Sequence, residues 1–165
     1  EFVWITEFPM FEYSETEGRY MAMHHPFTSP MPEHLDMMLS GNLKDCKAQA
    51  YDLVLNGVEI GGGSIRIHNP EVQEKVFRLL GLTEEQVQEK FGFFVDAFKF
   101  GAPPHGGLAF GLDRIVATME GQESIRDFIA FPKNTSASSP MDQSPSEVDL
   151  QQLQDIHISV NLGKK

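Results

Sequence analysis

Two carboxylates beside a run of glycines are the residues of this chain best suited to chemistry. They lie in residues 50–69, which read AYDLVLNGVEIGGGSIRIHN. The pair Asn56-Gly57 predicts a β-hairpin, because a two-residue type I′ turn needs positive φ at both central residues. Val54 then faces Glu59, so Asp52 and Glu59 project from one face of the hairpin. Two acids beside a backbone without side chains predict a site for a ligand that approaches the strand closely.

A β-bulge is expected within residues 61–63. Val58 and Ile60 belong to the expected core face of the hairpin, whereas Ile65 and Ile67 are the apolar positions beyond the glycines. A strand changes parity in this way only if one residue is left out of the pairing. The bulge brings three polar residues round to the carboxylate face: Ser64, Arg66 and His68. An exposed face with solvated charges is the alternative, but three consecutive glycines weaken a strand and favour a site.

A second candidate site lies where a short strand meets a helix. Leu108–Phe110 predicts a buried strand, Gly111 a hinge and Leu112–Met119 a helix. The free N–H groups and the dipole at the start of a helix make an anion site. Arg114 in the first turn is unfavourable on dipole grounds, and an anion held between the N–H groups and the guanidinium would explain it. A surface salt bridge to Asp113 or another neighbour is the alternative.

The adjacent histidines His24 and His25 are the third feature. They stand in residues 24–32, which contain three prolines, so a loop is expected. Adjacent histidines lack the i, i+4 spacing of a metal-binding pair on a helix. The loop leads toward the hairpin, so contact with a bound substrate and simple packing both remain open.

Capping signals predict the helices around these sites. Asn69-Pro70 and the capping box at residues 83–86 each start a helix, and Gly81 and Gly101 end them. Gly92 predicts a break in the second helix. The remaining segments are a strand over 2–11 interrupted at Pro9, an acidic turn over 13–18, a strand over 19–23, a helix over 32–43, a short element over 123–131, a loop over 132–145 and a helix over 146–156.

Composition limits the classes of function. The 165 residues suit about one domain, and the net charge of −11 with a pI near 4.9 repels polyanions. Contacts to a nucleic acid backbone are therefore expected mostly from parts of the protein other than these residues. No apolar run is long enough to span a membrane, and the single cysteine, Cys46, excludes an internal disulfide and fits a reducing compartment. The chain starts at Glu1 without Met, so a partial chain is expected.

Four motifs together resemble one enzyme family. They are HHPFT at 24–28, GGGSIRIHN at 61–69, KFGF at 90–93 and GLAFGLDR at 107–114. The last resembles the third signature motif of class II aminoacyl-tRNA synthetases, and the combination resembles the C-terminal part of the catalytic domain of bacterial-type aspartyl-tRNA synthetases. The resemblance runs from Phe2 to about Val160.

The resemblance implies a fold and a reaction. The fold is α+β, with an antiparallel sheet flanked by helices. L-aspartate and ATP would give aspartyl-adenylate and pyrophosphate, and the aspartyl group would then pass to the 3′ end of tRNA. The implied site residues are Asp52 and Glu59 for Mg²⁺, Glu59, Gly111, Leu112, Asp113 and Arg114 for ATP, and His24, His25, Ser64 and Arg66 for aspartate. Asp52, Glu59 and Arg114 are the residues expected to serve catalysis, with the Arg114 guanidinium on the γ-phosphate.

The resemblance also implies what these residues lack. Residues 1–165 correspond to the C-terminal portion of the catalytic domain, without the anticodon-binding domain and the first two class II motifs. The parent enzyme is expected to be a cytoplasmic homodimer. An asparaginyl- or lysyl-tRNA synthetase, a tRNA-independent paralogue and a non-catalytic ATP- or Mg²⁺-binding module remain as alternatives.

Overall fold

The computed structural model describes residues 1–161, and the chain divides into two compact units. The first unit runs from Glu1 to Glu123, and the second begins at Ser124. The first unit contains all the candidate site residues. In the second unit, Asp149 caps helix α5 (Leu150–Asp155), because its side chain accepts from the Gln151 amide; the helix lies within the predicted range 146–156 but starts at Leu150.

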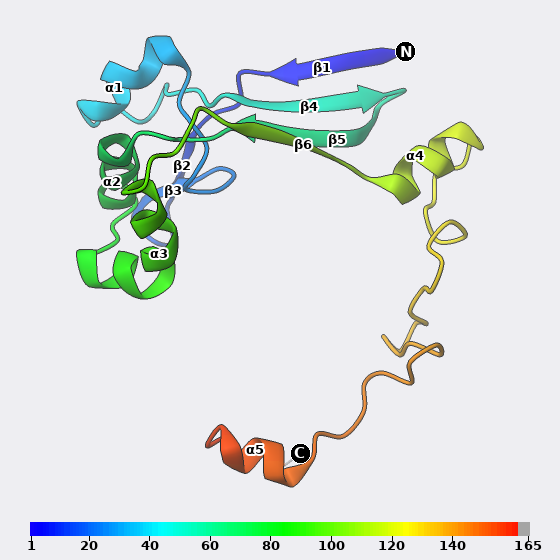
Figure 1. Ribbon diagram of the computed structural model, residues 1–165. Helices are drawn as coiled ribbons and strands as arrows, with labels where there is room; N and C mark the ends of the chain where they lie inside the picture. Colours follow the sequence, from blue (N-terminus) through cyan, green and yellow to red (C-terminus); the bar gives the residue numbers. More distant parts are fainter. Residues whose placement is uncertain (162–165) are drawn as a thin grey trace. The chain divides into compact units, whose positions relative to one another are not determined.

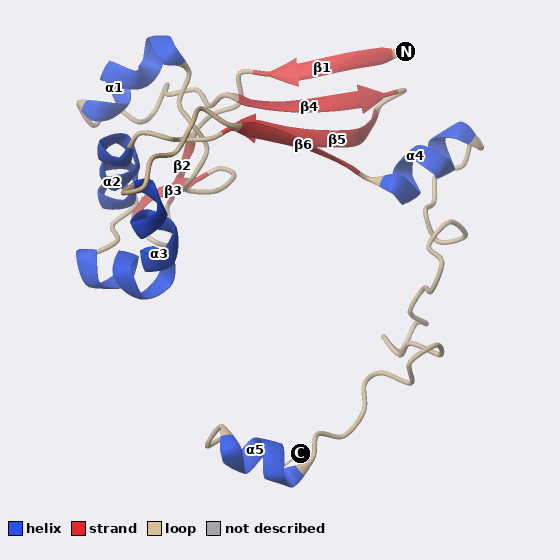
Figure 2. Ribbon diagram, viewed as in Figure 1, coloured by secondary structure: helices blue, strands red, loops and turns tan. Residues whose placement is uncertain are grey.

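A four-stranded antiparallel sheet is the centre of the first unit (Figures 1 and 2). Its strands lie in the order β1 (Phe2–Thr6), β4 (Ala50–Leu55), β5 (Val58–Ile65) and β6 (Gly106–Phe110). A separate two-stranded ribbon pairs β2 (Phe11–Ser14) with β3 (Arg19–Ala22). The pairings of β4 with both β1 and β5, and of β5 with β6, are antiparallel, and the β4–β5 pair is the predicted hairpin.

Helices lie beyond both ends of this sheet. The short helices η1 (Pro32–His34) and α1 (Leu35–Leu39), together with α2 (Pro70–Leu79) and α3 (Glu84–Phe98), gather beyond one end in Figure 1. Helix α4 (Leu112–Met119) lies beyond the other end, directly after β6. The antiparallel sheet with flanking helices confirms the predicted α+β fold.

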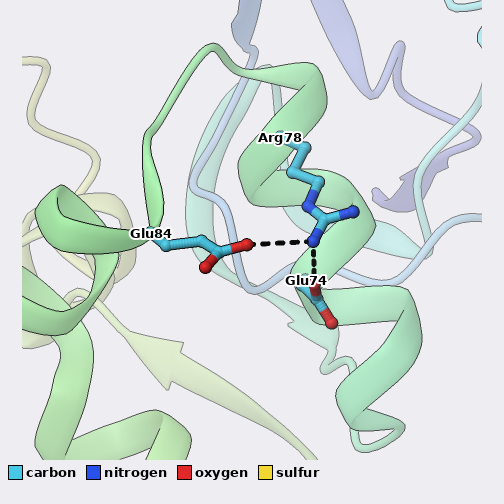
Figure 3. Close-up of polar contacts among 3 residues, drawn as sticks. All are labelled: Glu74, Arg78 and Glu84. Carbon is cyan, nitrogen blue, oxygen red and sulfur yellow. Dashed lines mark hydrogen bonds and ion pairs between the residues drawn. The ribbon is translucent and has the colours of Figure 1, made fainter.

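Helices α2 and α3 form a hairpin that is fixed at its turn. The side chain of Asn69 caps α2, and Thr83 forms the predicted capping box with Gln86. Arg78 binds the Glu74 carboxylate one turn earlier in α2 and the Glu84 carboxylate at the start of α3, at 3.2 Å (Figure 3). All three side chains are more than half exposed, so these ion pairs contribute at most about 1 kcal/mol each.

An aromatic cluster joins this helical hairpin to the histidine loop. Phe27 packs on Phe91 and Phe94, with ring centroids 5.4 and 4.6 Å away, and Phe77 stacks on Phe91. Behind the cluster, Gln73 is buried and its Nε2 donates to the carbonyl of Pro26 at 2.8 Å. Helices α2 and α3 therefore anchor the loop that carries the two histidines.

The bulge occurs one residue before the predicted position. Leu53 pairs with Gly61 and Val54 with Glu59, which leaves Ile60 without a partner in β4. Each of the three glycines is instead needed for close packing. A Cβ at Gly61 would lie 2.7 Å from the Phe110 ring, one at Gly63 would overlap a backbone carbonyl of β6, and one at Gly62 would overlap the Asp52 carboxylate.

Three other predictions are wrong. Helix α3 continues through Gly92, which is buried, because Phe91 and Phe94 pack against Phe27. Strand β6 is exposed along its whole length, because it forms an edge of the sheet and nothing in the described residues covers it. Residues 123–131 form bends and turns and no regular element.

Two smaller differences concern exposure and length. Val58, predicted to face the core, is 41% exposed beside the hairpin turn. The helix predicted over 32–43 ends at Leu39. In the part of the chain that the structure describes, no helix is long and apolar enough to cross a membrane.

Candidate active site

The hairpin places Asp52 and Glu59 on one face of the sheet. Asp52 is opposite Gly62, and Glu59 is opposite Val54, two residues along β4 from Asp52. Both carboxylates lie over Gly62, because a Cβ there would overlap Asp52 and lie 3.5 Å from Oε1 of Glu59. The predicted pair of carboxylates therefore exists, and the missing side chain of Gly62 provides the space for it.

The chemistry of this pair fits a hard divalent cation. Burial raises the pKa of Asp52 above its ordinary value, the Glu59 carboxylate raises it further, and His24 acts in the opposite direction. A cation between the two carboxylates would relieve their repulsion. Among residues 1–161, no three His, Cys, Asp or Glu side chains are placed to hold a metal ion. The two carboxylates alone suit Mg²⁺, which is usually bound by one or two protein carboxylates together with phosphate oxygens.

Arg114 reaches this pair from the first turn of α4. Its Nη1 donates to the backbone carbonyl of Glu59 at 3.0 Å and lies 3.5 Å from the Glu59 carboxylate. The start of α4 is held against β5 by a hydrogen bond, in which the Gly111 amide donates to the carbonyl of Ile60 at 2.9 Å. Arg114 thus contacts Glu59 on the hairpin, and not its neighbour Asp113. Both side chains of the pair are about half exposed.

Arg66 and His25 meet just beyond the end of β5. Arg66 follows the last residue of β5 and forms an isolated bridge with Thr28, and its Nη1 is 3.0 Å from Nδ1 of His25. Within the described part of the chain, no Asp or Glu oxygen lies within 4.0 Å of the Arg66 guanidinium. An arginine without a carboxylate partner is suited to bind a carboxylate from a ligand.

Ser64 and His24 complete the predicted set. Ser64 is 3% exposed, and its hydroxyl has no hydrogen-bond partner among the residues described. His24 is exposed and contacts Phe8 edge-on, with ring centroids 5.3 Å apart. His25, in contrast, contacts the Arg66 guanidinium. His68, also expected on this face, is exposed in the segment that follows β5.

The sequence did not indicate the residues that support the site from behind. Phe91 and Phe94 pack against Phe27 of the histidine loop and hold that loop in place. The spacing of the phenylalanines in α3 predicts an apolar helix face but does not identify the segment that packs against it. The HHPFT motif, in which Phe27 stands two residues after the second histidine, was the available signal.

Comparison with known proteins identifies the family of the chain that carries this site. Residues 1–135 match the family described as tRNA synthetases class II (D, K and N). The chain is 58% identical over 160 residues to an aspartate–tRNA ligase of Flavobacterium psychrophilum, which covers 97% of this chain and 27% of that protein. It is 51% identical over 171 residues to an aspartate–tRNA(Asp/Asn) ligase of Thermodesulfovibrio yellowstonii, which covers 98% of this chain and 29% of that protein.

A solved structure supports the fold. The aspartyl tRNA synthetase from Entamoeba histolytica matches with a TM-score of 0.62 and 24% identity, over 84% of this chain and 24% of that one. The chain thus spans a little over a quarter of the length of the curated relatives that it matches.

Proposed function

Because the chain belongs to the class II tRNA synthetases of the D, K and N family, we propose that the protein that carries it is an aspartate–tRNA ligase. This enzyme would activate L-aspartate with ATP and transfer the aspartyl group to tRNA. The names of the similar proteins support aspartate over lysine and asparagine. We further propose that it acts in the cytoplasm as a homodimer and contacts tRNA mainly through parts outside these residues.

The single observation that carries the choice of aspartate is the Arg66 guanidinium without a carboxylate partner. A fixed positive charge attracts the side-chain carboxylate of aspartate, repels the ammonium of lysine and gains less from the neutral amide of asparagine. The planar guanidinium can also bind both oxygens of a carboxylate at once. Ser64, with its free buried hydroxyl, and the histidines would bind around the same amino acid.

The cluster around Glu59 would bind ATP. Asp52 and Glu59 would hold Mg²⁺, which supplies neutralisation of phosphate charge when bound. Arg114 would bind the γ-phosphate, and Gly111, Leu112 and Asp113 would contact the nucleotide at the start of α4, where free N–H groups and the helix dipole favour an anion.

The chemistry requires positioning more than proton transfer. The α-carboxylate of aspartate attacks the α-phosphate of ATP, a bond to the bridging oxygen breaks, and pyrophosphate leaves. The residues of this chain would orient the two substrates and offset the charge on the departing phosphates, which are effective forms of catalysis. The adenylate would then donate its aspartyl group to a hydroxyl at the 3′ end of tRNA, releasing AMP. We assign no residue of this chain to the α-phosphate.

The test is amino-acid-dependent exchange of pyrophosphate into ATP by the full-length enzyme. Aspartate should support exchange, whereas asparagine and lysine should not. Arg66→Ala should raise the KM for aspartate by about 100-fold or more, because a charged group of the substrate loses its partner, with a much smaller change in the KM for ATP. Equal exchange with asparagine, or equal loss for both substrates in the variant, would contradict the proposal.

A further inference from the structure

Nδ1 of His25 contacts two groups that can only donate a hydrogen bond, and the Thr28 hydroxyl, which can donate or accept, lies 3.4 Å from both ring nitrogens. The backbone amide of Phe27 lies 3.2 Å from Nδ1, and Nη1 of Arg66 lies 3.0 Å from the same atom. Neither a backbone N–H nor a guanidinium can accept a hydrogen bond. Nδ1 must therefore be the acceptor in both contacts, and the proton of the neutral ring must be on Nε2.

Arg66 has its orientation set by this neutral acceptor. Its backbone amide is already paired with the carbonyl of His105 at 2.9 Å, so only the side chain is free to turn. A carboxylate in the place of His25 would also orient the guanidinium. That carboxylate would, however, neutralise the positive charge of Arg66 and compete with the carboxylate of a ligand. An imidazole acceptor fixes the guanidinium and leaves the full positive charge available.

The loop around His25 is rigid enough for this role. The carbonyl of Phe27 accepts from the Ile67 amide at 2.9 Å, and the Ser29 amide donates to the carbonyl of Ile65 at 2.9 Å. These bonds tie the loop to the end of β5 on either side of Arg66. Thr28 is 2% exposed, and Phe27 is packed in the aromatic cluster.

We propose that His25 is a positioning residue, which acts through Arg66: its Nδ1 holds the guanidinium in the orientation that binds the side-chain carboxylate of the amino acid. This inference rests on the proposed function, and it replaces direct contact of His25 with aspartate by an indirect role. The neutral form that it requires is favoured, because burial lowers the pKa of His25, and the neighbouring Arg66 and His24 lower it further.

A pair of conservative variants tests the role of Nδ1 in the full-length enzyme. Asparagine places a polar atom where Nδ1 stands, two bonds from Cβ, whereas glutamine places one near the position of Nε2. His25→Gln and His25→Ala should each raise the KM for aspartate by about 10- to 100-fold, the usual effect of losing a hydrogen bond to a charged group. His25→Asn should stay within about threefold of the wild type, and none of the variants should change the KM for ATP to a similar extent.

Two outcomes of these assays would overturn the inference. If His25→Asn is as impaired as His25→Ala, an acceptor at the Nδ1 position is not what the site needs. If the KM values for aspartate and ATP rise together, the histidine merely supports the fold of the loop.

A spectroscopic measurement keeps the inference testable apart from the reaction. In ¹⁵N-histidine NMR of the unliganded wild-type enzyme at pH 7, the His25 ring should be neutral, with the proton on Nε2. An Nδ1–H tautomer or a charged ring would overturn the inference even if aspartate is the substrate. Absence of aspartate-dependent exchange in the wild type would instead contradict the proposed function and leave the tautomer result standing on its own.

Discussion

Asp52 and Glu59 repel each other wherever both are ionised, and this repulsion should be measurable. The folded-state pKa of Asp52 is raised, mainly by burial and then by Glu59, so the folded state prefers the protonated acid. Folding stability should therefore fall as the pH rises above about 3.8 toward the raised pKa, and the loss should persist at higher pH. Asp52→Asn should have a higher Tm than the wild type at neutral pH without Mg²⁺, and this difference should disappear in acid.

Thermal unfolding of the full-length enzyme and the variant across pH, with and without Mg²⁺, checks this prediction. Mg²⁺ should raise the Tm of the wild type at neutral pH and have little effect on Asp52→Asn. Equal Tm values at every pH, or an equal response to Mg²⁺, would show that the two carboxylates do not form a common cation site.

Glu59 differs from Asp52 because it also contacts Arg114. Glu59→Gln keeps the shape of the side chain and its backbone contact but removes the charge that would hold the cation. We expect a loss of about 100-fold or more in the rate of adenylate formation, the usual effect of removing one electrostatic group from an active site. The Tm should change little, because the pair with Arg114 is half exposed. Wild-type dependence of the rate on Mg²⁺ in Glu59→Gln would exclude this carboxylate as a ligand.

At the scale of elements, the site depends on the three glycines of β5. Gly61 and Gly63 let β6 approach β5 closely, and Gly62 leaves space for the Asp52 carboxylate. Gly62→Ala would put a methyl group where Asp52 now lies. The carboxylate would have to move, and a displacement of about 1 Å can cost about 100-fold in rate. The rate of pyrophosphate exchange should therefore fall by about 100-fold, and it should respond more weakly to Mg²⁺.

Gly107→Ala is the matched control for this substitution. Gly107 lies in β6 of the same sheet, and a Cβ there would meet open space. Exchange by this variant should stay close to that of the wild type. If Gly107→Ala is impaired as strongly as Gly62→Ala, the sheet tolerates no added methyl group and the effect does not report on Asp52.

At the scale of the whole molecule, the exposed edges of the sheet are the dominant feature. Strands β1 and β6 are the two edges, and all their residues are exposed, including Trp4 at 54% and Phe110 at 56%. Unpaired strand edges with apolar side chains favour association with other strands. The 165 residues expressed alone should therefore self-associate and show no pyrophosphate exchange, since no residue here is assigned to the α-phosphate.

Light scattering and the exchange assay on the purified chain check this prediction. The same measurements on the full-length enzyme provide the reference for both. A folded monomer of the 165 residues that turns over aspartate and ATP would show that the site does not depend on other parts of the protein.

The sequence by itself determined the features that depend on neighbouring residues. The turn at Asn56-Gly57, the caps at Asn69 and Thr83 and the start of α4 after Gly111 were all predicted correctly. Each of these is decided by the φ preference or the hydrogen bonds of a few residues in a row. The face shared by Asp52 and Glu59 followed in the same way, because strand alternation is a local rule.

Only the tertiary structure decided which distant groups meet. Arg114 contacts Glu59 across 55 residues of chain, and Arg66 contacts His25 across 41. Local preferences carry no information on such pairs, so sequence patterns left open whether Arg114 binds an anion or a carboxylate, and whether His25 packs or binds. The place of the bulge and the exposure of β6 were mistaken for the same reason: both depend on how closely neighbouring strands pack and on what covers them.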